Sequence, residues 1–260
     1  MQRTELDLSE VKRKITNFVK RKVEESQMDG VLLSLDGEID SAVTAHLCVE
    51  AVGSRRVTGL IMPDLRTSAG EEVADARTVA NELCLETRQF DIAPIHKSFM
   101  KALESNKVAE ENLGARIRMS ILYHHANLLN RLVAGTADKS EILLGHFTKY
   151  GDGGVDILPI GDLYKTEVRK LGEVLGINRR IVAKKRRRVE AWTPRSRLDS
   201  GMDYDTTDQI LKLRFDQGLD AATISAVVRK SQARVEGVIA RHDWSVHKRE
   251  KPEVCVVRPI

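Results

Sequence analysis

The stretch Val31-Leu-Leu-Ser-Leu-Asp-Gly-Glu-Ile-Asp-Ser41 decides the fold of this chain. Residues 31–35 form a short apolar run, which is typical of a buried strand, and residues 41–52 carry apolar side chains at helical spacing. The polar residues between them form a short loop. A strand, a short loop and a helix in this order predict the first repeat of a parallel α/β sheet.

The same alternation continues along the chain. Apolar runs predict further strands at residues 56–62, 86–92 and 131–134, and periodic stretches predict helices at residues 69–83 and 112–130. Parallel strands are joined by right-handed crossovers, which place helices on both faces of the sheet. We therefore predict an α/β fold with a doubly wound parallel sheet. Ligands of such sheets bind at the carboxyl ends of the strands, where the loop at 36–41 and the loop after 131–134 should emerge.

The composition is consistent with one α/β domain that encloses a sizeable core. The chain has 260 residues, of which 42% are hydrophobic and 31% charged. Cys48, Cys84 and Cys255 are far apart and odd in number, which favours neither a disulfide framework nor a metal site. No segment approaches the roughly 20 apolar residues of a membrane span, and the first residues lack the apolar run of a signal peptide. We expect a cytoplasmic protein with no membrane partner.

A basic run begins at Arg179. Residues 179–188 include seven lysines and arginines, and without these seven charges the net charge of +4 would be −3. The sequence around this run has no clear helical or strand period. We predict a basic mobile loop at 178–201, between an α/β core at 12–177 and a helical C-terminal part at 202–260.

The basic run leaves two interpretations open. It can be solvated loop charge, or it can bind the phosphate backbone of a nucleic acid in a salt-dependent way. The chain has only two Trp, five Phe and four Tyr, so a platform on which bases could stack is not evident. We do not expect a nucleic-acid partner, and we keep a nucleic-acid-binding protein as an alternative function.

Two later stretches pack fixed charges among glycines. They are Gly145-His-Phe-Thr-Lys-Tyr-Gly-Asp-Gly-Gly-Val-Asp156 and Pro159-Ile-Gly-Asp-Leu-Tyr-Lys-Thr166. With Ser34-Leu-Asp-Gly-Glu-Ile-Asp-Ser41, Ala115-Arg-Ile-Arg118 and Gly135-Thr-Ala-Asp-Lys-Ser-Glu141, they occur in the order that ammonia-dependent NAD synthetases require. The chain therefore resembles that family. The resemblance implies the adenine nucleotide hydrolase-like fold of the ATP pyrophosphatases.

The resemblance also implies a two-step ligase reaction. ATP would activate the nicotinate carboxylate of deamido-NAD as an adenylate and release pyrophosphate, and ammonia would then form the amide of NAD and release AMP. Magnesium is the implied cofactor, ATP the co-substrate and a homodimer the implied assembly. Positioning and electrostatics dominate such a reaction, which agrees with the lack of an evident Ser-His or Cys-His pair.

The family resemblance implies which residues bind ATP and magnesium. The implied ATP-binding residues are Ser34, Gly37, Ile39, Asp40, Ser41, Thr136, Lys165 and Arg187. The implied catalytic residues are Asp40, Glu141 and Lys165, and the implied ligands of magnesium, which prefers oxygen, are Asp40 and Glu141. Amides at a helix N-terminus favour anions, although a plain strand–turn–helix joint is the alternative for the loop at 36–41. We expect Glu141 to be partly solvated; a glutamate in the first turn of a helix otherwise compensates the helix dipole.

The family resemblance also implies which residues bind deamido-NAD. They are Arg116, Arg118, Lys149, Asp152, Asp156, His247 and Lys248. Arg116 and Arg118 lie two apart on the predicted helix, so they should point to different sides. Guanidinium groups suit the phosphates of a dinucleotide because they can make bidentate contacts. Solvated helix arginines and a glycine-rich surface turn stay open as alternatives at these positions.

Two positions of the pyrophosphate loop depart from the family pattern Ser-Gly-Gly-x-Asp-Ser. Asp36 replaces the first serine and Glu38 replaces the second glycine. Their carboxylates would repel a polyphosphate, and the Cβ of Glu38 should hinder a left-handed backbone. Arg187 stands where the family has a hydroxyl that contacts ATP. We predict weak ATP binding and slow or absent turnover, and a catalytically impaired scaffold is the second alternative.

Overall fold

The computed structural model describes residues 6–66, 70–184 and 202–258. These residues divide into two compact units. The first unit contains residues 6–139 and 147–184, and the second contains residues 140–146 and 202–258. The candidate ATP ligand Arg187 lies outside the described residues.

The first unit alternates strands and helices. Its strands are β1 (Gly30–Ser34), β2 (Val57–Ile61), β3 (Glu86–Gln89) and β4 (Arg131–Val133), and its helices are α1 (Leu8–Glu25), α2 (Ile39–Val52), α3 (Gly70–Glu82), α4 (Ala93–Met100), α5 (Lys107–Leu129), α7 (Lys165–Val174) and α8 (Arg179–Val182). A short 3-10 turn, Ser54–Arg56, precedes β2. Each predicted strand overlaps an observed one. α5 begins before the predicted position because the Asn106 side chain caps it, accepting a hydrogen bond from the Ala109 amide at 3.1 Å.

The four strands of the described residues form one parallel sheet in the order β3-β2-β1-β4. β1 has a neighbour on each side, since Val31 is aligned with Val57 of β2 and with Leu132 of β4. The chain therefore builds one edge from β1 through β2 to β3 and then returns to the other side of β1. This order confirms the predicted doubly wound parallel sheet.

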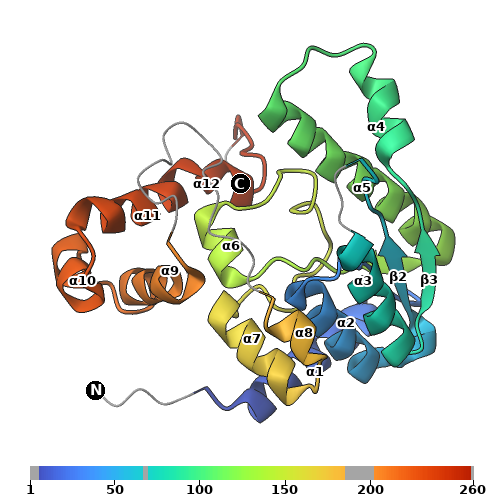
Figure 1. Ribbon diagram of the computed structural model, residues 1–260, viewed down its shortest axis with the longest axis horizontal. Helices are drawn as coiled ribbons and strands as arrows, with labels where there is room; N and C mark the ends of the chain where they lie inside the picture. Colours follow the sequence, from blue (N-terminus) through green and yellow to red (C-terminus); the bar gives the residue numbers. More distant parts are fainter. Residues whose placement is uncertain (1–5, 67–69, 185–201, 259–260) are drawn as a thin grey trace. The chain divides into compact units, whose positions relative to one another are not determined.

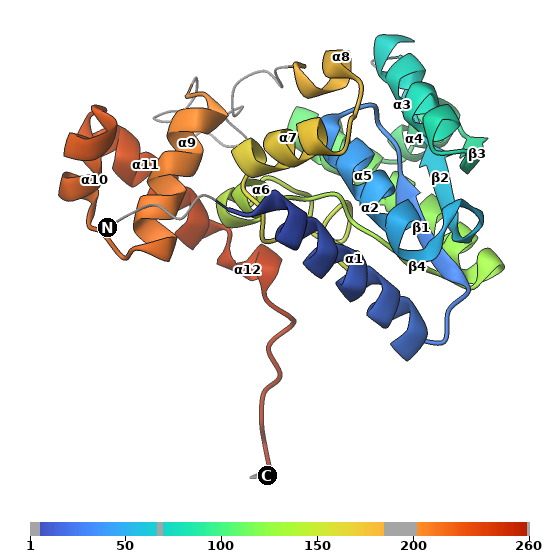
Figure 2. The same cartoon turned by 90° about the horizontal axis from the view of Figure 1, so that it is seen from below.

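Side chains of the strands alternate between two cores, so helices cover both faces of the sheet (Figure 1). Leu33 of β1 belongs to a core with residues of α1, α2, α3, α7 and α8. Its neighbour Leu32 points to the opposite face, where it shares a core with Ile117 and Leu122 of α5. α2 is buried along most of its length because it contacts β1 and β2 as well as α1 and α7 (Figure 2).

The central strands position the candidate site. β1 and β4 are adjacent and parallel, so the loops that follow them emerge at the same edge of the sheet. The loop after β1 contains Asp36 and leads into α2, and the loop after β4 contains Asp138 and leads into α6 (Lys139–Leu144). A further bridge, between Ala134 and Ile157, brings the glycine-rich segment alongside the end of β4.

The start of the predicted loop at 178–201 is helical, so this part of the prediction is wrong. The Asn178 side chain caps α8 by accepting a hydrogen bond from the Arg180 amide at 2.9 Å. Ile181 and Val182 are buried in the core of the first unit. Burial of these two apolar side chains orders a segment that its charge alone would leave in solvent. Residues 185–201 lie outside the described residues.

The second unit is helical as far as Arg249, which agrees with the predicted C-terminal helical tail, whereas residues 251–258 are not helical. It contains most of α6 together with α9 (Tyr204–Leu211), a π-helical segment (Lys212–Asp216), α10 (Ala221–Val228), α11 (Gln232–Trp244) and α12 (Val246–Arg249). The Asp203 side chain caps α9 by accepting a hydrogen bond from the Thr206 amide at 2.7 Å. Ile210 and Ile224 form part of the buried apolar surface of this unit. Within the described residues, no helix is long and apolar enough to cross a membrane.

Candidate functional site

The loop between β1 and α2 is folded around the carboxylate of Asp36. Its Oδ1 atom accepts hydrogen bonds from the Ser41 hydroxyl at 2.6 Å and from the Glu38 amide at 3.0 Å. Gly37 makes the turn with a φ of +80°, and a Cβ at this position would collide with the carbonyl oxygen of Glu72 in α3. The Ser41 hydroxyl and the Glu38 amide therefore donate to the Asp36 carboxylate of the same loop.

Glu38 does not strain the backbone of this loop, contrary to the expectation from the sequence. Its φ and ψ are −94° and 161°, which is an ordinary extended conformation. The left-handed position falls on Gly37 instead. The substitution acts through charge, because the Glu38 carboxylate lies 3.4 Å from Lys184 Nζ.

A buried ion-pair cluster lies where the loops after β1 and β4 meet. The Lys165 ammonium contacts Asp40 Oδ2 at 2.6 Å and Asp138 Oδ2 at 2.9 Å. Lys165 is 1% exposed, Asp138 is 0% exposed and Asp40 is 5% exposed. A charge at such depth is tolerated only when an opposite charge accompanies it. The three groups therefore stabilise one another, and two of the residues predicted from the sequence, Asp40 and Lys165, are in direct contact.

Three elements build this cluster. Asp40 lies in the first turn of α2, Asp138 directly precedes α6, and Lys165 is the first residue of α7. The start of α7 is fixed by Glu167, whose carboxylate accepts a hydrogen bond from the Tyr164 amide at 3.0 Å. Asp40 also benefits from the positive potential at the N-terminus of α2.

The donor set suits magnesium, although the described residues contain no preformed group of three or more His, Cys, Asp or Glu side chains that could hold a metal ion. Magnesium usually takes one or two carboxylates and completes its shell with water and substrate phosphate oxygens. Each of the two predicted ligands, Asp40 and Glu141, offers such a carboxylate. The chemistry of these side chains therefore fits the ion.

Glu141 is buried, so the expectation that it would be partly solvated is wrong. Its neighbour Ser140 is also buried and donates a hydrogen bond to Asp208 Oδ1 of α9 at 2.5 Å. This contact holds α6 against α9 within the second unit. The first turn of α6 is covered for this reason.

Arg116 and Arg118 contact different partners, as predicted. Arg118 Nε donates to the Met62 carbonyl, just after β2, at 2.8 Å. Burial lowers the pKa of Arg118, and nearby carboxylates, Asp152 among them, oppose this shift. Arg116 Nε donates to the Lys149 carbonyl at 3.3 Å. The structure thus brings Arg116 and Lys149 together, two of the residues predicted for deamido-NAD.

Two carboxylates of the glycine-rich segment bind backbone amides. Asp152 Oδ1 accepts a hydrogen bond from the Thr148 amide at 2.8 Å. Asp156 Oδ2 accepts one from the Val133 amide at 2.8 Å, and its Oδ1 accepts one from the Tyr123 hydroxyl at 2.9 Å. Burial and the Asp156 carboxylate raise the pKa of Tyr123. Asp156 therefore anchors this segment to the end of β4, a role that the sequence does not reveal.

His247 and Lys248 lie on α12 in the second unit. Lys248 Nζ donates to the carbonyl of Gly145, the first glycine of the glycine-rich segment, at 2.8 Å. Gly145 has a φ of +64°, and a Cβ at this position would collide with Ser245. His247 is exposed. Two motifs that are far apart in the sequence therefore meet within this unit.

The other residues predicted to bind ATP lie at the ends of the central strands. Ser34 is the last residue of β1 and is partly buried. Ile39 is the first residue of α2 and is buried. Thr136 is partly buried in the loop after β4.

Three residues of this region were not predicted from the sequence. Asp138 is part of the motif at 135–141, but no contact to Lys165 follows from its position there. Lys184 is one of seven positive charges in the basic run, and Asp75 is one of several acidic residues in α3. Lys184 Nζ lies 3.3 Å from Asp75 Oδ2, a pairing that only the fold produces.

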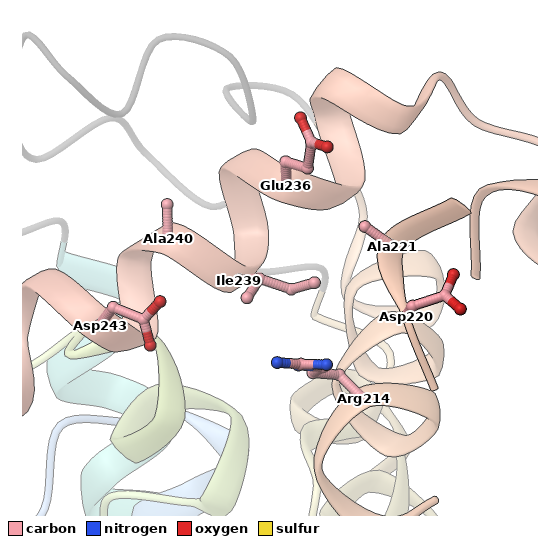
Figure 3. Close-up of a pocket in the computed structure, with 7 residues that line it drawn as sticks. All are labelled: Arg214, Asp220, Ala221, Glu236, Ile239, Ala240 and Asp243. Atoms are coloured by element: carbon pink, nitrogen blue, oxygen red, sulfur yellow. The ribbon is translucent and has the colours of Figure 1, made fainter. Parts of the chain in front are cut away.

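A cavity of about 240 Å³ lies in the second unit (Figure 3). It is lined by Arg214, Asp220, Ala221, Glu236, Ile239, Ala240 and Asp243. Figure 3 shows the Arg214 side chain pointing toward α11. None of the residues predicted from the sequence is among these seven, so this cavity is not the site that the sequence predicts.

Sequences of known proteins agree with these features. A profile of the NAD synthase family matches residues 11–252. An NH3-dependent NAD+ synthetase of Archaeoglobus fulgidus is 44% identical over 264 residues, which cover 98% of this chain and 100% of the relative. An NH3-dependent NAD+ synthetase of Methanocaldococcus jannaschii is 46% identical over 213 residues, which cover 79% of this chain and 81% of the relative.

Solved structures are similar over almost the whole chain. An NH3-dependent NAD synthetase of Campylobacter jejuni, in complex with the nitrate ion, has a TM-score of 0.77 and 31% identity, with 96% of this chain and 100% of the other chain covered. An NMN synthetase of Francisella tularensis has a TM-score of 0.77 and 28% identity, with 96% of this chain and 99% of the other chain covered.

Proposed function

Because the chain belongs to the NAD synthase family, we propose that it joins ammonia to deamido-NAD with the use of ATP and forms NAD, AMP and pyrophosphate. The observation that carries this proposal is the buried cluster of Lys165, Asp40 and Asp138 beside two adjacent parallel strands. Ligands of doubly wound sheets bind at this edge. A fixed ammonium group there suits the negative charge that develops on departing pyrophosphate.

In the first step, a nicotinate carboxylate oxygen attacks the α-phosphorus of ATP, and pyrophosphate leaves with the electrons of the broken bond. We assign the phosphates of ATP to the loop at 36–41 and to Lys165. Two carboxylates already orient Lys165, so little reorganisation is needed when the substrate arrives. The remaining ATP contacts are assigned to Ser34, Ile39, Thr136 and Arg187.

In the second step, ammonia attacks the acyl carbon of the adenylate. The tetrahedral intermediate expels AMP, and the nitrogen loses one proton to become the amide. The dinucleotide is assigned to Arg116, Arg118, Lys149, Asp152, Asp156, His247 and Lys248. Arg116 donates to the backbone carbonyl of Lys149, so its guanidinium lies beside the glycine-rich segment, and such a group suits the phosphates of deamido-NAD.

Magnesium is part of this proposal. Asp40 and Glu141 would hold it, and when bound it supplies positive charge that stabilises phosphate oxygens. Asp40 would then serve the ion as well as Lys165, which it contacts through one carboxylate oxygen. A homodimer and a cytoplasmic location enter the proposal from the family resemblance and the sequence.

The nucleic-acid alternative gains no support from the described start of the basic run. Arg180 Nε lies 3.3 Å from Asp75 Oδ1, and Lys184 contacts both Asp75 and Glu38. These two cations are thus paired with carboxylates of their own unit. The sequence comparisons likewise point to a ligase and not to a nucleic-acid-binding protein.

The proposal is tested by incubating the full chain with deamido-NAD, ATP, magnesium and ammonium chloride, and by measuring NAD and AMP. We expect the two products in a one-to-one ratio. Nicotinate mononucleotide is offered in parallel because one of the similar structures is an NMN synthetase. Product from the mononucleotide alone would correct the substrate, and no product from either compound would favour the scaffold alternative.

A further inference from the structure

Lys184 connects the pyrophosphate loop to α3. Its ammonium group lies 3.4 Å from the Gly37 carbonyl oxygen, 3.4 Å from Glu38 Oε1 and 3.3 Å from Asp75 Oδ2. The first two partners belong to the loop and the third belongs to α3. One side chain therefore contacts both the left-handed glycine of the loop and the acidic residue that replaces a glycine.

Asp75 is the partner that holds Lys184 on the side of α3. Its side chain is 7% exposed, and its Oδ1 atom lies 3.3 Å from Arg180 Nε of α8. A buried carboxylate needs positive partners, and Arg180 and Lys184 meet this need from one short segment. The same helix α3 packs directly against Gly37, since the Glu72 carbonyl occupies the place of a Cβ there.

Lys184 supplies positive charge next to two carboxylates. Glu38 and Asp75 lie 3.4 and 3.3 Å from its ammonium group, while Arg180 pairs with Asp75 and lies 4.0 Å from Glu71. Partial burial lowers the pKa of Lys184, but Glu38 and Asp75 outweigh burial and raise it above its ordinary value. Lys184 is therefore a cation at neutral pH, and it cancels the charge that Glu38 adds beside the loop.

We propose that Lys184, anchored by Asp75, is a positioning residue that holds the pyrophosphate loop in place and offsets the charge of Glu38. The inference deepens the proposed function and rests on it only for the identity of the ligand, a polyphosphate. The order that Lys184 gives to the loop is a property of the ligand-free protein. It can be measured whether or not the chain binds ATP.

The loop is tested first by hydrogen exchange of the backbone amides at 36–41 in the nucleotide-free chain. Lys184→Met should raise the exchange rate of these amides about threefold, the scale of a partly exposed ion pair. The double variant Lys184→Met with Glu38→Gln should reverse at least half of this increase in exchange rate, because it lacks the Glu38 charge that Lys184 offsets. Lys20→Met, which removes an exposed lysine from α1, is the matched control and should change nothing.

ATP titration with magnesium then separates this inference from the proposed function. Lys184→Met should weaken ATP binding about three- to tenfold, Lys184→Arg should stay within about twofold of the natural chain, and the double variant should recover. Unchanged exchange in Lys184→Met, or strictly additive effects of Lys184→Met and Glu38→Gln, would overturn the inference. If the natural chain binds no ATP while the exchange results hold, the proposed function fails and the positioning role stands.

Discussion

Two lysines each bridge a pair of carboxylates beside the same loop, and they differ in depth. Lys165 has a side chain that is 1% exposed, and it contacts its two partners at 2.6 and 2.9 Å. Lys184 has a side chain that is 25% exposed, and it contacts its two partners at 3.4 and 3.3 Å. One partner of each lies within residues 36–41: Asp40, in the first turn of α2, for the first lysine and Glu38, just before α2, for the second.

This difference in burial means that the ion pairs of Lys165 are held more rigidly than those of Lys184. Water cannot replace a partner lost from a buried cluster, so removal of the Lys165 charge leaves two carboxylates without compensation. Around Lys184, water and salt screen the charges and reduce what each pair contributes. We infer that the buried lysine sets the geometry for the reaction and that the exposed lysine adjusts the loop.

The largest effect is expected from Lys165→Met. The buried carboxylates of Asp40 and Asp138 would lose their counterion, so the free energy of unfolding should fall by about 3–5 kcal/mol. Urea denaturation measures this loss. Changing Asp40 and Asp138 to Asn in the same variant should recover part of it, and an unfolding free energy equal to that of the natural chain would contradict a tightly coupled cluster.

A smaller effect is expected from Glu141→Gln. The amide has the shape of the carboxylate but lacks its charge, so ATP binding at saturating magnesium should weaken about ten- to a hundredfold, the scale of one charged contact. Calorimetric titration of ATP across magnesium concentrations measures the change. The same affinity in both proteins at every magnesium concentration would remove Glu141 from the set of proposed ligands.

The fold was predictable where the sequence repeats a simple period. Residues 31–35 carry apolar side chains on both faces of a strand, and the helix that follows at 41–52 is mostly apolar, so the parallel sheet follows from local patterns. The helix α8 was not predictable in this way. Its buried residues, Ile181 and Val182, are two apolar positions inside a basic run, and their burial depends on a core built by other segments.

The candidate site was predictable only in part. Motif order located Asp40 and Lys165, which the structure places in contact. It did not reveal that Asp156 binds the Val133 amide, or that Asp75 pairs with Lys184, because both contacts join segments distant in sequence. Pairings of this kind depend on the tertiary fold, and the local spacing of apolar residues does not predict them.

An intermediate effect of opposite sign is expected from the double change Asp36→Ser with Glu38→Gly. In the natural chain the Asp36 carboxylate accepts hydrogen bonds from the Ser41 hydroxyl and from the backbone amide of residue 38. In the variant these two donors would become available to phosphate. We expect ATP affinity to rise by at least about tenfold, since two negative charges leave the neighbourhood of a polyanion. Titration of both proteins in the same magnesium and salt checks this. Micromolar binding by the natural chain with no gain in the variant would show that Asp36 and Glu38 do not face the phosphates.

The smallest effect is expected from Lys184→Met on global stability. Its ion pairs are long and partly exposed, so the free energy of unfolding should change by no more than about 1 kcal/mol and should change less at high salt. Urea denaturation at two salt concentrations, beside Lys165→Met, makes the comparison direct. A loss as large as that of Lys165→Met would mean that depth does not distinguish the two lysines.

Activation of the nicotinate carboxylate by adenylation can be followed with an isotope experiment. Deamido-NAD labelled with ¹⁸O in both oxygens of that carboxylate is incubated with the chain, ATP, magnesium and ammonia, and the products are analysed by mass spectrometry. We expect one ¹⁸O atom in AMP and one in the amide carbonyl of NAD, because the carboxylate oxygen that attacks the α-phosphorus leaves with AMP. Label in inorganic phosphate together with ADP, or NAD formed without labelled AMP, would contradict the adenylate mechanism.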